Sequence, residues 1–273
     1  MDTLLSAEAM SGRAAAWKRE GLTIGFVPTM GFLHRGHVSL MEALRPRVDR
    51  LVVSIYVNPL QFGPKEDLGR YPRDPEGDSQ KCAAVGVDAL FMPENLYPSG
   101  FSTSVEVSGL TERLCGAFRP GHFEGVATVC TRLFGLTRAD VAILGEKDYQ
   151  QLQVVRRLVR DLALPVEIVG GELIRDEDGL ALSSRNVYLS PDERKRALTL
   201  SKAMRAMASG GGDVEARLAL GRSILDVDKL DYLEIVDPDT LQPATDLSKP
   251  TRAVIAAFVG KTRLLDNVAV AAV

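Results

Sequence analysis

Apolar and polar residues follow two distinct patterns along the first 170 positions of the chain. Short runs rich in β-branched residues predict buried strands, and most of them are separated by longer segments whose apolar residues recur at helical spacing. Solidly apolar strands alternating with helices are typical of a parallel sheet covered on both faces. The predicted strands are Thr23–Val27, Leu51–Val57, Asp88–Met92, Val141–Leu144 and Val166–Val169.

The spacing of apolar residues predicts the helices between these strands. Leu40, Met41 and Leu44 mark one of them. Ligands of such sheets bind at the carboxyl ends of the strands, near the point where the strand order reverses. We therefore expect the functional residues in the loops that directly follow strands. A second helix is marked by Tyr149, Leu152, Val155, Leu158, Val159 and Leu162.

The pattern changes beyond about residue 173, where a smaller α+β unit is expected. Ser190 and Pro191 are a good cap and a good first helical residue, and the helix that they begin runs into a glycine-rich connector at 209–213. We expect an α/β fold with two domains, residues 1–173 and residues 174–273. The second contains a short helix near Val214–Ile224 and strands at Asp231–Val236, Arg252–Val259 and Arg263–Val270.

The composition is that of an ordinary globular protein. The 273 residues are 45% hydrophobic and 25% charged, and the net charge of −3 gives no reason to expect nucleic acid or an anionic membrane as a partner. Cys82, Cys115 and Cys130 form no Cys-x-x-Cys pair, which favours buried thiols in a reducing compartment. We see neither a secretion signal nor an apolar run of the ~20 residues that a membrane helix needs, so a cytoplasmic protein is expected.

The segment GFLHRGH, residues 31–37, is the first candidate site, because it lies where a strand is expected to become a helix. Gly31 and Gly36 allow tight turns and a close backbone approach. A helix beginning near residues 35–36 points its N–H groups and positive dipole end at the loop, which suits a phosphate. His34 and His37 can face the same way and donate to a polyphosphate. The alternative is that His37 is a half-buried core residue, because it shares a stripe with Leu40.

Two further candidate loops follow strands and carry phosphate- or substrate-binding side chains. Asn58 and Gln61 follow Leu51–Val57, and their amides can bind hydroxyl and carboxylate groups; an ordinary Asn-Pro turn is the alternative. Lys147 follows the strand Val141–Leu144 and can pair with phosphate oxygens, beside a predicted helix N-cap at Asp148. An exposed loop lysine is the alternative there.

Two other polar segments are more ambiguous on sequence grounds. Arg119 and His122 lie in a turn before an apolar helix, and we interpret them as a solvated turn rather than as substrate contacts. Ser183, Ser184 and Arg185 follow an Asp-Gly turn and resemble a mobile phosphate clamp, although an ordinary polar loop has the same composition. The chain has no nucleophile elbow, no Walker-type loop and no zinc-ligand spacing, so positioning and charge stabilisation of phosphate remain.

Six segments, in order and well spaced, strongly resemble the pantoate–β-alanine ligase (pantothenate synthetase) family. Residues 200–250 match least distinctively. The matching segments are PTMGFLHRGHVSL (28–40), VNPLQF (57–62), RPGHFEGVATV (119–129), LGEKDYQQL (144–152), LALSSRNVYLS (180–190) and GKTRLLDN (260–267).

The resemblance implies a fold and a reaction. The fold is a Rossmann-like nucleotidyltransferase domain with an H-x-G-H signature, followed by a small C-terminal domain that closes over the site. The reaction uses ATP and magnesium: the pantoate carboxylate attacks the α-phosphate to give pantoyl adenylate and pyrophosphate, and the amine of β-alanine then displaces AMP. Magnesium is expected to be bound mainly through the ATP phosphates, and the protein is expected to be a homodimer.

The resemblance also implies roles for individual residues. His37 matches the catalytic proton donor, with His34 beside it on the phosphates and Lys147 as a phosphate ligand. Gln61 matches the glutamine shared by pantoate and β-alanine, and Gln151 the second pantoate-binding glutamine. The full ATP-binding set comprises Met30, Gly31, Phe32, Leu33, His34, Arg35, Gly36, His37, Gly145, Glu146, Lys147, Asp148, Ile174, Leu182, Ser183, Ser184 and Arg185.

Two other functions stay open on sequence grounds. One is a different pyrophosphate-releasing adenylyltransferase of the same superfamily with another acceptor; Gln61 and Gln151 in their contexts favour the ligase. The other is a nucleotide-binding or scaffold protein that kept the fold without catalysis. The intact set of His34, His37, Lys147 and Ser183–Arg185 argues against loss of activity.

Overall fold

The computed structural model describes residues 1–64 and 66–272 and divides into two compact units. The first unit contains Met1–Thr111, Arg119–Glu146 and Gln151–Glu172. The second begins at Leu173 and also includes two earlier segments, Glu112–Phe118 and Lys147–Gln150. The expected division into 1–173 and 174–273 follows sequence order, whereas these two short segments belong with the later part of the chain.

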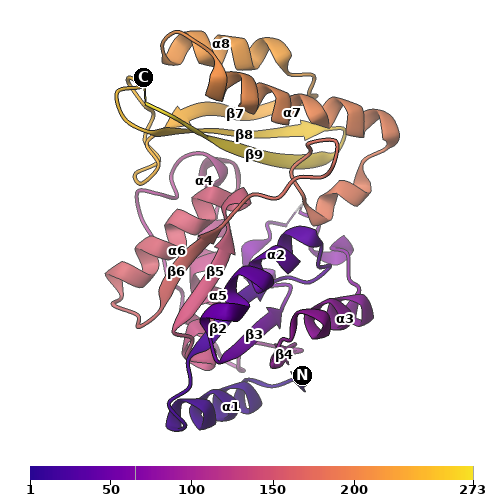
Figure 1. Ribbon diagram of the computed structural model, residues 1–273, viewed down its shortest axis with the longest axis vertical. Coiled ribbons are helices and arrows are strands. Elements are labelled where there is room, and N and C mark those ends of the chain that lie inside the picture. Colours follow the sequence, from indigo (N-terminus) through magenta and orange to yellow (C-terminus); the bar gives the residue numbers. More distant parts are fainter. Residues whose placement is uncertain (65, 273) are drawn as a thin grey trace. The chain divides into compact units, whose positions relative to one another are not determined.

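The first unit is built on a six-stranded parallel sheet with the order β1-β4-β3-β2-β5-β6 (Figure 1). The chain moves outward from β2 to β3 and β4 and then returns to the other side of β2 with β5, so the strand order reverses between β2 and β5. The strands are β1 (Asp2–Leu4), β2 (Ile24–Thr29), β3 (Arg50–Ile55), β4 (Ala89–Phe91), β5 (Val141–Gly145) and β6 (Glu167–Gly171).

Five of these strands confirm the predictions made from apolar runs. The central residues of β2, β3, β4 and β5 are buried because both faces of the sheet are covered, which is why these strands read as solid rather than alternating apolar segments. Those of β6, at the edge of the sheet, are half-buried. β1 was not predicted. It has three residues, two of them exposed, and it pairs with β4 at the edge of the sheet.

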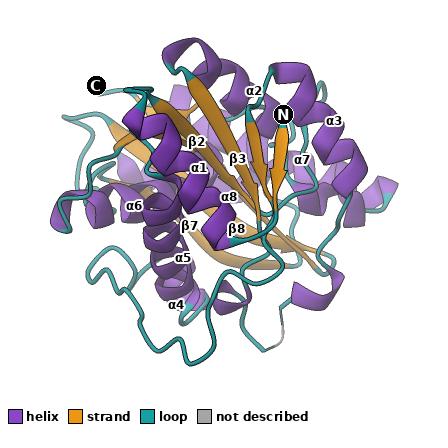
Figure 2. Cartoon of the chain, turned by 90° about the horizontal axis from the view of Figure 1, so that it is seen from below, coloured by secondary structure: helices purple, strands orange, loops and turns teal. Residues whose placement is uncertain are grey.

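Consecutive residues of β2 identify the helices on the two faces. A Cβ on Gly25 would lie 3.0 Å from Leu44 of α2, so that face carries α2. Phe26 points to the opposite face, where its ring meets Phe134 of α5 edge-on, with 6.2 Å between the centroids. Figure 2 shows α1 in front of the strands of this sheet, and α1 packs against α5. The helices are α1 (Ala7–Arg19), α2 (Arg35–Leu44), α3 (Pro75–Val85), α5 (His122–Thr137) and α6 (Tyr149–Asp161).

The prediction for the end of α6 was wrong by one apolar position. The helix ends at Asp161, and the side chain of Leu162 is 48% exposed instead of extending the buried stripe. Leu152, Val155 and Leu158 of the same stripe are buried as predicted. Helix ends depend on the following chain, here a reversal through Ala163 at φ +48°, which apolar spacing does not encode.

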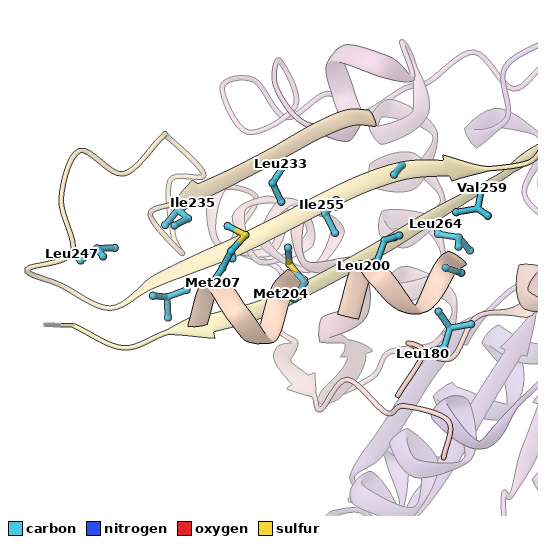
Figure 3. Packing of buried hydrophobic residues seen from close by; sticks show 14 residues of the cluster. Leu180, Leu200, Met204, Met207, Leu233, Ile235, Leu247, Ile255, Val259 and Leu264 are labelled. Carbon is cyan, nitrogen blue, oxygen red and sulfur yellow. The ribbon is translucent and has the colours of Figure 1, made fainter. Parts of the chain in front are cut away.

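The second unit is a three-stranded antiparallel sheet packed against helices. Its core joins the apolar face of α7 to β7–β9, as Figure 3 shows for Leu200, Met204, Ile255 and Leu264. The Ser190 cap is confirmed, with the reciprocal Ser190–Glu193 pair of a capping box. The elements are α4 (Cys115–Phe118), α7 (Pro191–Ser209), α8 (Val214–Ile224), β7 (Lys229–Val236), β8 (Thr251–Val259) and β9 (Thr262–Val270).

The three cysteines are buried and form no disulfide, as the sequence predicted. Burial raises the pKa of both the Cys82 and the Cys130 thiols to about 12, so neither is a thiolate at neutral pH. In the described part of the chain, no helix is both long enough and apolar enough to span a bilayer.

Candidate active site

The loop that follows β2 has a fixed shape because a carboxylate from another element binds its backbone. Gly31 and Phe32 lie in the left-handed region, at φ +84° and +51°. Asp78 of α3 accepts the N–H of Phe32 at 2.7 Å and that of Leu33 at 2.6 Å. A left-handed non-glycine residue is strained, and these two hydrogen bonds offset that strain.

Asp78 is almost completely buried, with 1% of its surface exposed. Burial raises the pKa of its carboxyl group above the ordinary value, although the N–H groups of Leu33 and Phe32 and the charge of Lys81 oppose the shift. Asp78 was not predicted, because a buried acid in a helix has no signature in a single sequence.

His34 and His37 cap the helix that they begin. The N–H of Gly36 donates to Nδ1 of His34 at 3.2 Å, and the N–H of His34 donates to Nδ1 of His37 at 3.3 Å. The two rings lie 4.1 Å apart between centroids. A neutral imidazole whose Nδ1 accepts carries its proton on Nε2, so this reciprocal cap selects the Nε2–H tautomer of both side chains.

The predicted start of this helix near residues 35–36 is confirmed, since α2 begins at Arg35. Both histidines are half-buried, as the alternative for His37 on the Leu40 stripe also expects. What sets His37 apart from the apolar residues of that stripe is its ring, whose Nδ1 accepts the N–H of His34. Arg35 points elsewhere: its guanidinium pairs with Glu42 on the exposed side of the helix at 2.5 Å.

Gln61 lies at the carboxyl end of β3, in the 3₁₀ turn Pro59–Gln61, and is buried. Its amide nitrogen approaches Sδ of Met30 at 2.9 Å, and its oxygen accepts from Asn58 at 3.3 Å. Asn58 also accepts from the hydroxyl of Tyr97 at 2.8 Å and donates to the carbonyl of Gly125 at 3.0 Å. The Gln61 amide therefore lies beside Met30 of the loop at residues 30–34, called the histidine loop below. Asn58 also caps the turn, which confirms the alternative of an Asn-Pro turn, while its role in binding stays a prediction.

The interpretation of Arg119 and His122 as a solvated turn was wrong. Arg119 donates to both carboxylate oxygens of Glu66, at 2.7 and 2.6 Å, and His122 is 9% exposed. Burial would raise the pKa of Glu66, but the hydrogen bond and charge of Arg119 outweigh it and hold this pKa below its ordinary value. Glu66 and Gln61, which lie 53 and 61 positions away in sequence, bind the side chains of Arg119 and His122.

The predicted site residues at and after the end of β5 belong to different units. Gly145 and Glu146 belong to the first unit together with Gln151, which lies in the first turn of α6. Lys147 and Asp148 belong to the second unit, where Lys147 contacts the Asp148 carboxylate at 3.3 Å. The Lys147 side chain is only 21% exposed, which disfavours an ordinary exposed lysine.

The last predicted ATP segment lies within the second unit, where its two parts come together. The N–H of Leu182 donates to the carbonyl of Ile174 at 3.0 Å across the Asp-Gly turn. Ser183 caps the 3₁₀ turn Ser184–Tyr188 by accepting the N–H of Arg185 at 3.3 Å, and Ser184 is buried. Arg175 next to this turn forms a two-fold ion pair with Asp266, with both distances 2.7 Å, and this pair was not predicted.

In each unit the predicted donors fit an anionic ligand better than a metal ion. The first unit offers imidazole N–H groups and a helix N-terminus, and the second offers an ammonium and hydroxyls; all of these favour phosphate oxygens. Among residues 1–64 and 66–272, no cluster of three or more His, Cys, Asp or Glu side chains is arranged to hold a cation.

Comparison with known proteins decides the family. The sequence profile described as pantoate-beta-alanine ligase matches residues 3–269. The chain belongs to the pantoate–β-alanine ligase family. It is therefore an enzyme, a ligase of pantothenate biosynthesis, as the six sequence segments predicted.

Relatives of the ligase family match almost the whole chain. It is 52% identical to a pantothenate synthetase of Myxococcus xanthus, over 93% of this chain and 90% of the relative, and 54% identical to one of Thermus thermophilus, over 94% and 95%. A crystal structure of a Thermus thermophilus pantothenate synthetase covers 98% of this chain and 99% of its own, with a TM-score of 0.93 and 50% identity. The predicted α/β fold is confirmed by this match.

A second ligase structure was solved with ligands. The Francisella tularensis pantoate-beta-alanine ligase, described as complexed with beta-gamma ATP and beta-alanine, has a TM-score of 0.83 at 32% identity, covering 98% of this chain and 97% of its own. The shared fold extends to a relative with two thirds of its residues different.

Proposed function

We propose that this ligase condenses pantoate with β-alanine in two steps, through an enzyme-bound pantoyl adenylate. In the first step a carboxylate oxygen of pantoate bonds to the α-phosphorus of ATP and pyrophosphate leaves. In the second step the amine of β-alanine bonds to the acyl carbon, loses a proton, and AMP leaves with the bridging oxygen. No enzyme nucleophile is needed, because adenylation supplies the leaving group.

The observation that carries this proposal is the mutual cap of His34 and His37. Their Nδ1 atoms accept backbone N–H groups, so in the neutral form each ring has its proton on Nε2. Such donors at a helix N-terminus stabilise negative charge that develops on phosphate during transfer. Asp78 holds the preceding loop by two backbone hydrogen bonds, so contacts within the protein support this arrangement.

Neutral amides suit the organic substrate. We assign pantoate to Gln61 and Gln151 and β-alanine to Gln61, because an amide can bind hydroxyl and carboxylate without adding charge that would compete with the ATP phosphates. The contact of Gln61 with Met30 of the histidine loop supports this assignment, since it places the amide beside the proposed phosphate-binding residues.

The remaining ATP-binding residues are assigned to the triphosphate. Lys147 supplies a cation, and Ser183, Ser184 and Arg185 supply hydroxyls and a planar guanidinium. Magnesium enters as the complex with ATP, since this ion is commonly held by substrate phosphates and retains several waters. Two further properties of the family are proposed for this chain, a cytoplasmic location and a homodimeric state; sedimentation equilibrium tests the second.

Oxygen-labelled pantoate tests the two-step route. With ¹⁸O in the pantoate carboxylate, the proposal expects one labelled oxygen in AMP and none in free phosphate. Label in inorganic phosphate with ADP formation would instead indicate an acyl phosphate route and would overturn the proposal. AMP formation that does not require pantoate would favour an adenylyltransferase with another acceptor.

A further inference from the structure

The segment that carries Gln61 is held by the first turn of α5 through contacts of different kinds. Nδ1 of His122 lies 2.9 Å from the carbonyl oxygen of Gln61, and Asn58 donates to the carbonyl of Gly125. A Cβ on Gly125 would lie 2.3 Å from the carbonyl oxygen of Leu60 and 2.6 Å from the backbone N of Gln61. The turn and the helix therefore touch backbone to backbone.

The neighbours of His122 determine its tautomer. Nε2 lies 2.9 Å from a guanidinium nitrogen of Arg119, and a guanidinium only donates, so Nε2 is the acceptor. The proton is then on Nδ1, where it is donated to the carbonyl of Gln61, which only accepts. Both hydrogen bonds require the same neutral form of the ring.

Glu66 completes the chain of contacts. Its two oxygens accept from Nε and from a terminal nitrogen of Arg119, the two-point geometry that fixes a guanidinium in its plane. A chain of hydrogen bonds thus connects the half-buried carboxylate of Glu66, through Arg119 and His122, to the backbone of Gln61. Arg119 also reaches that carbonyl at the longer distance of 3.4 Å.

We propose that His122 is a positioning residue of the ligase reaction: its Nδ1–H, oriented by the Arg119–Glu66 pair, sets the Gln61 backbone and thereby the amide that binds pantoate. This inference rests on the proposed function, because it takes Gln61 as the pantoate ligand. His122 acts through Gln61. Its loss affects capture of pantoate and leaves capture of ATP unchanged.

Two substitutions of His122 separate the Nδ1 donor from the bulk of the ring. In His122→Asn the amide nitrogen occupies the Nδ1 position and can still donate to the Gln61 carbonyl. In His122→Gln the amide lies one bond further out, at the Nε2 position, so the donor to Gln61 is lost while the contact with Arg119 can remain. The two variants are matched in polarity and differ in which hydrogen bond they keep.

The measured quantities are the steady-state constants for pantoate and ATP, with urea unfolding to verify folding. We expect His122→Gln to raise KM for pantoate at least about tenfold with KM for ATP within about twofold, since small displacements of a positioning group are costly. His122→Asn should keep KM for pantoate within about threefold of the wild type. In a Gln61→Ala background, His122→Gln should raise KM for pantoate by less than about twofold further, because His122 acts through the Gln61 amide.

Different outcomes overturn different statements. If Gln61→Ala raises KM for pantoate while folded His122→Gln does not, the positioning role is wrong and the proposed function stands. If Gln61→Ala leaves KM for pantoate unchanged, the assignment of Gln61 fails and the role of His122 fails with it. Equal effects of His122→Asn and His122→Gln would also overturn the Nδ1 mechanism. If His122→Gln does not fold, Glu66→Gln takes its place, with a smaller rise in KM for pantoate expected and an unchanged value overturning the proposal.

Discussion

The N–H of His34 donates to Nδ1 of His37 at 3.3 Å, so the proposed proton donor is also part of the cap of its own helix. The spacing of the two histidines follows from this geometry, because a capping box joins the N-cap residue to the third residue of the helix. Nδ1 of His37 accepts the hydrogen bond of the cap, and the proton of the neutral ring is therefore on Nε2.

Substitution of His37 should separate these two tasks. His37→Asn keeps an acceptor at the δ position for the N–H of His34 but has no group at Nε2. We expect adenylate formation to fall at least ~10²-fold, measured as pantoate-dependent exchange of pyrophosphate into ATP. Unfolding stability should stay near the wild-type value, whereas His37→Ala should also lose about 1 kcal/mol of capping. A near-normal exchange rate in folded His37→Asn would contradict the assigned role.

Lys147→Ala should lower adenylate formation at least ~10²-fold, because an ammonium that pairs with phosphate oxygens is removed. Folding should change little: Asn267 donates to the backbone carbonyl of Lys147, and this contact survives in the variant. Pyrophosphate exchange measures the first effect and urea unfolding the second. Lys147→Arg is the control, since it keeps the charge, and it should retain more activity than Lys147→Ala.

Asp78→Asn tests how the histidine loop is held. The carboxylate accepts two N–H groups, and an amide must turn its NH₂ toward one of them. We expect unfolding stability to fall by about 1–3 kcal/mol, together with a higher KM for ATP. Chemical denaturation and steady-state kinetics measure the two effects. Unchanged values of both would mean that the loop keeps its shape without this carboxylate.

The Glu66–Arg119 pair predicts a dependence of stability on pH. The folded-state pKa of Glu66 is below its ordinary value of 4.5, so its ionised form stabilises the fold fully above that value, and this stabilisation is lost as the pH falls through the folded pKa. The stability difference between wild type and Glu66→Gln should thus be constant near neutrality and shrink below about pH 4. Urea midpoints measured across this range test it, and a constant difference would contradict the pairing.

Two glycines of α5 form a matched pair of alanine substitutions. A Cβ on Gly125 would meet the backbone of Leu60 and Gln61, whereas nothing lies within 4 Å of a Cβ on Gly135. Gly125→Ala should destabilise the protein and raise KM for pantoate. Gly135→Ala should stabilise the fold by about 0.5–1 kcal/mol without kinetic change, because alanine is the better helix former. Similar behaviour of the two variants would contradict the close approach at Gly125.

Features encoded locally were predictable from the sequence, and features set by distant partners were not. Ser190 with Glu193 is a local signal, and the cap formed as predicted. The burial of Arg119 and His122 depends on Glu66 and Gln61, which no spacing rule connects to them. Asp78 was missed for the same reason, since its partners lie more than 40 positions away. β1 was missed because three edge residues show no periodicity.

The strand order has a consequence for how the protein is made. β2 pairs with β3 at Gly25 and Leu51, which leave the ribosome close together, whereas its other neighbour begins at Val141. Loop closure over such a distance is slow compared with pairing of nearby strands. One edge of β2, the strand that precedes the histidine loop, therefore stays unpaired until more than half of the chain has been synthesised. Nascent chains stopped before Val141 should expose this apolar strand edge to chaperones, while chains released after Gly171 should not.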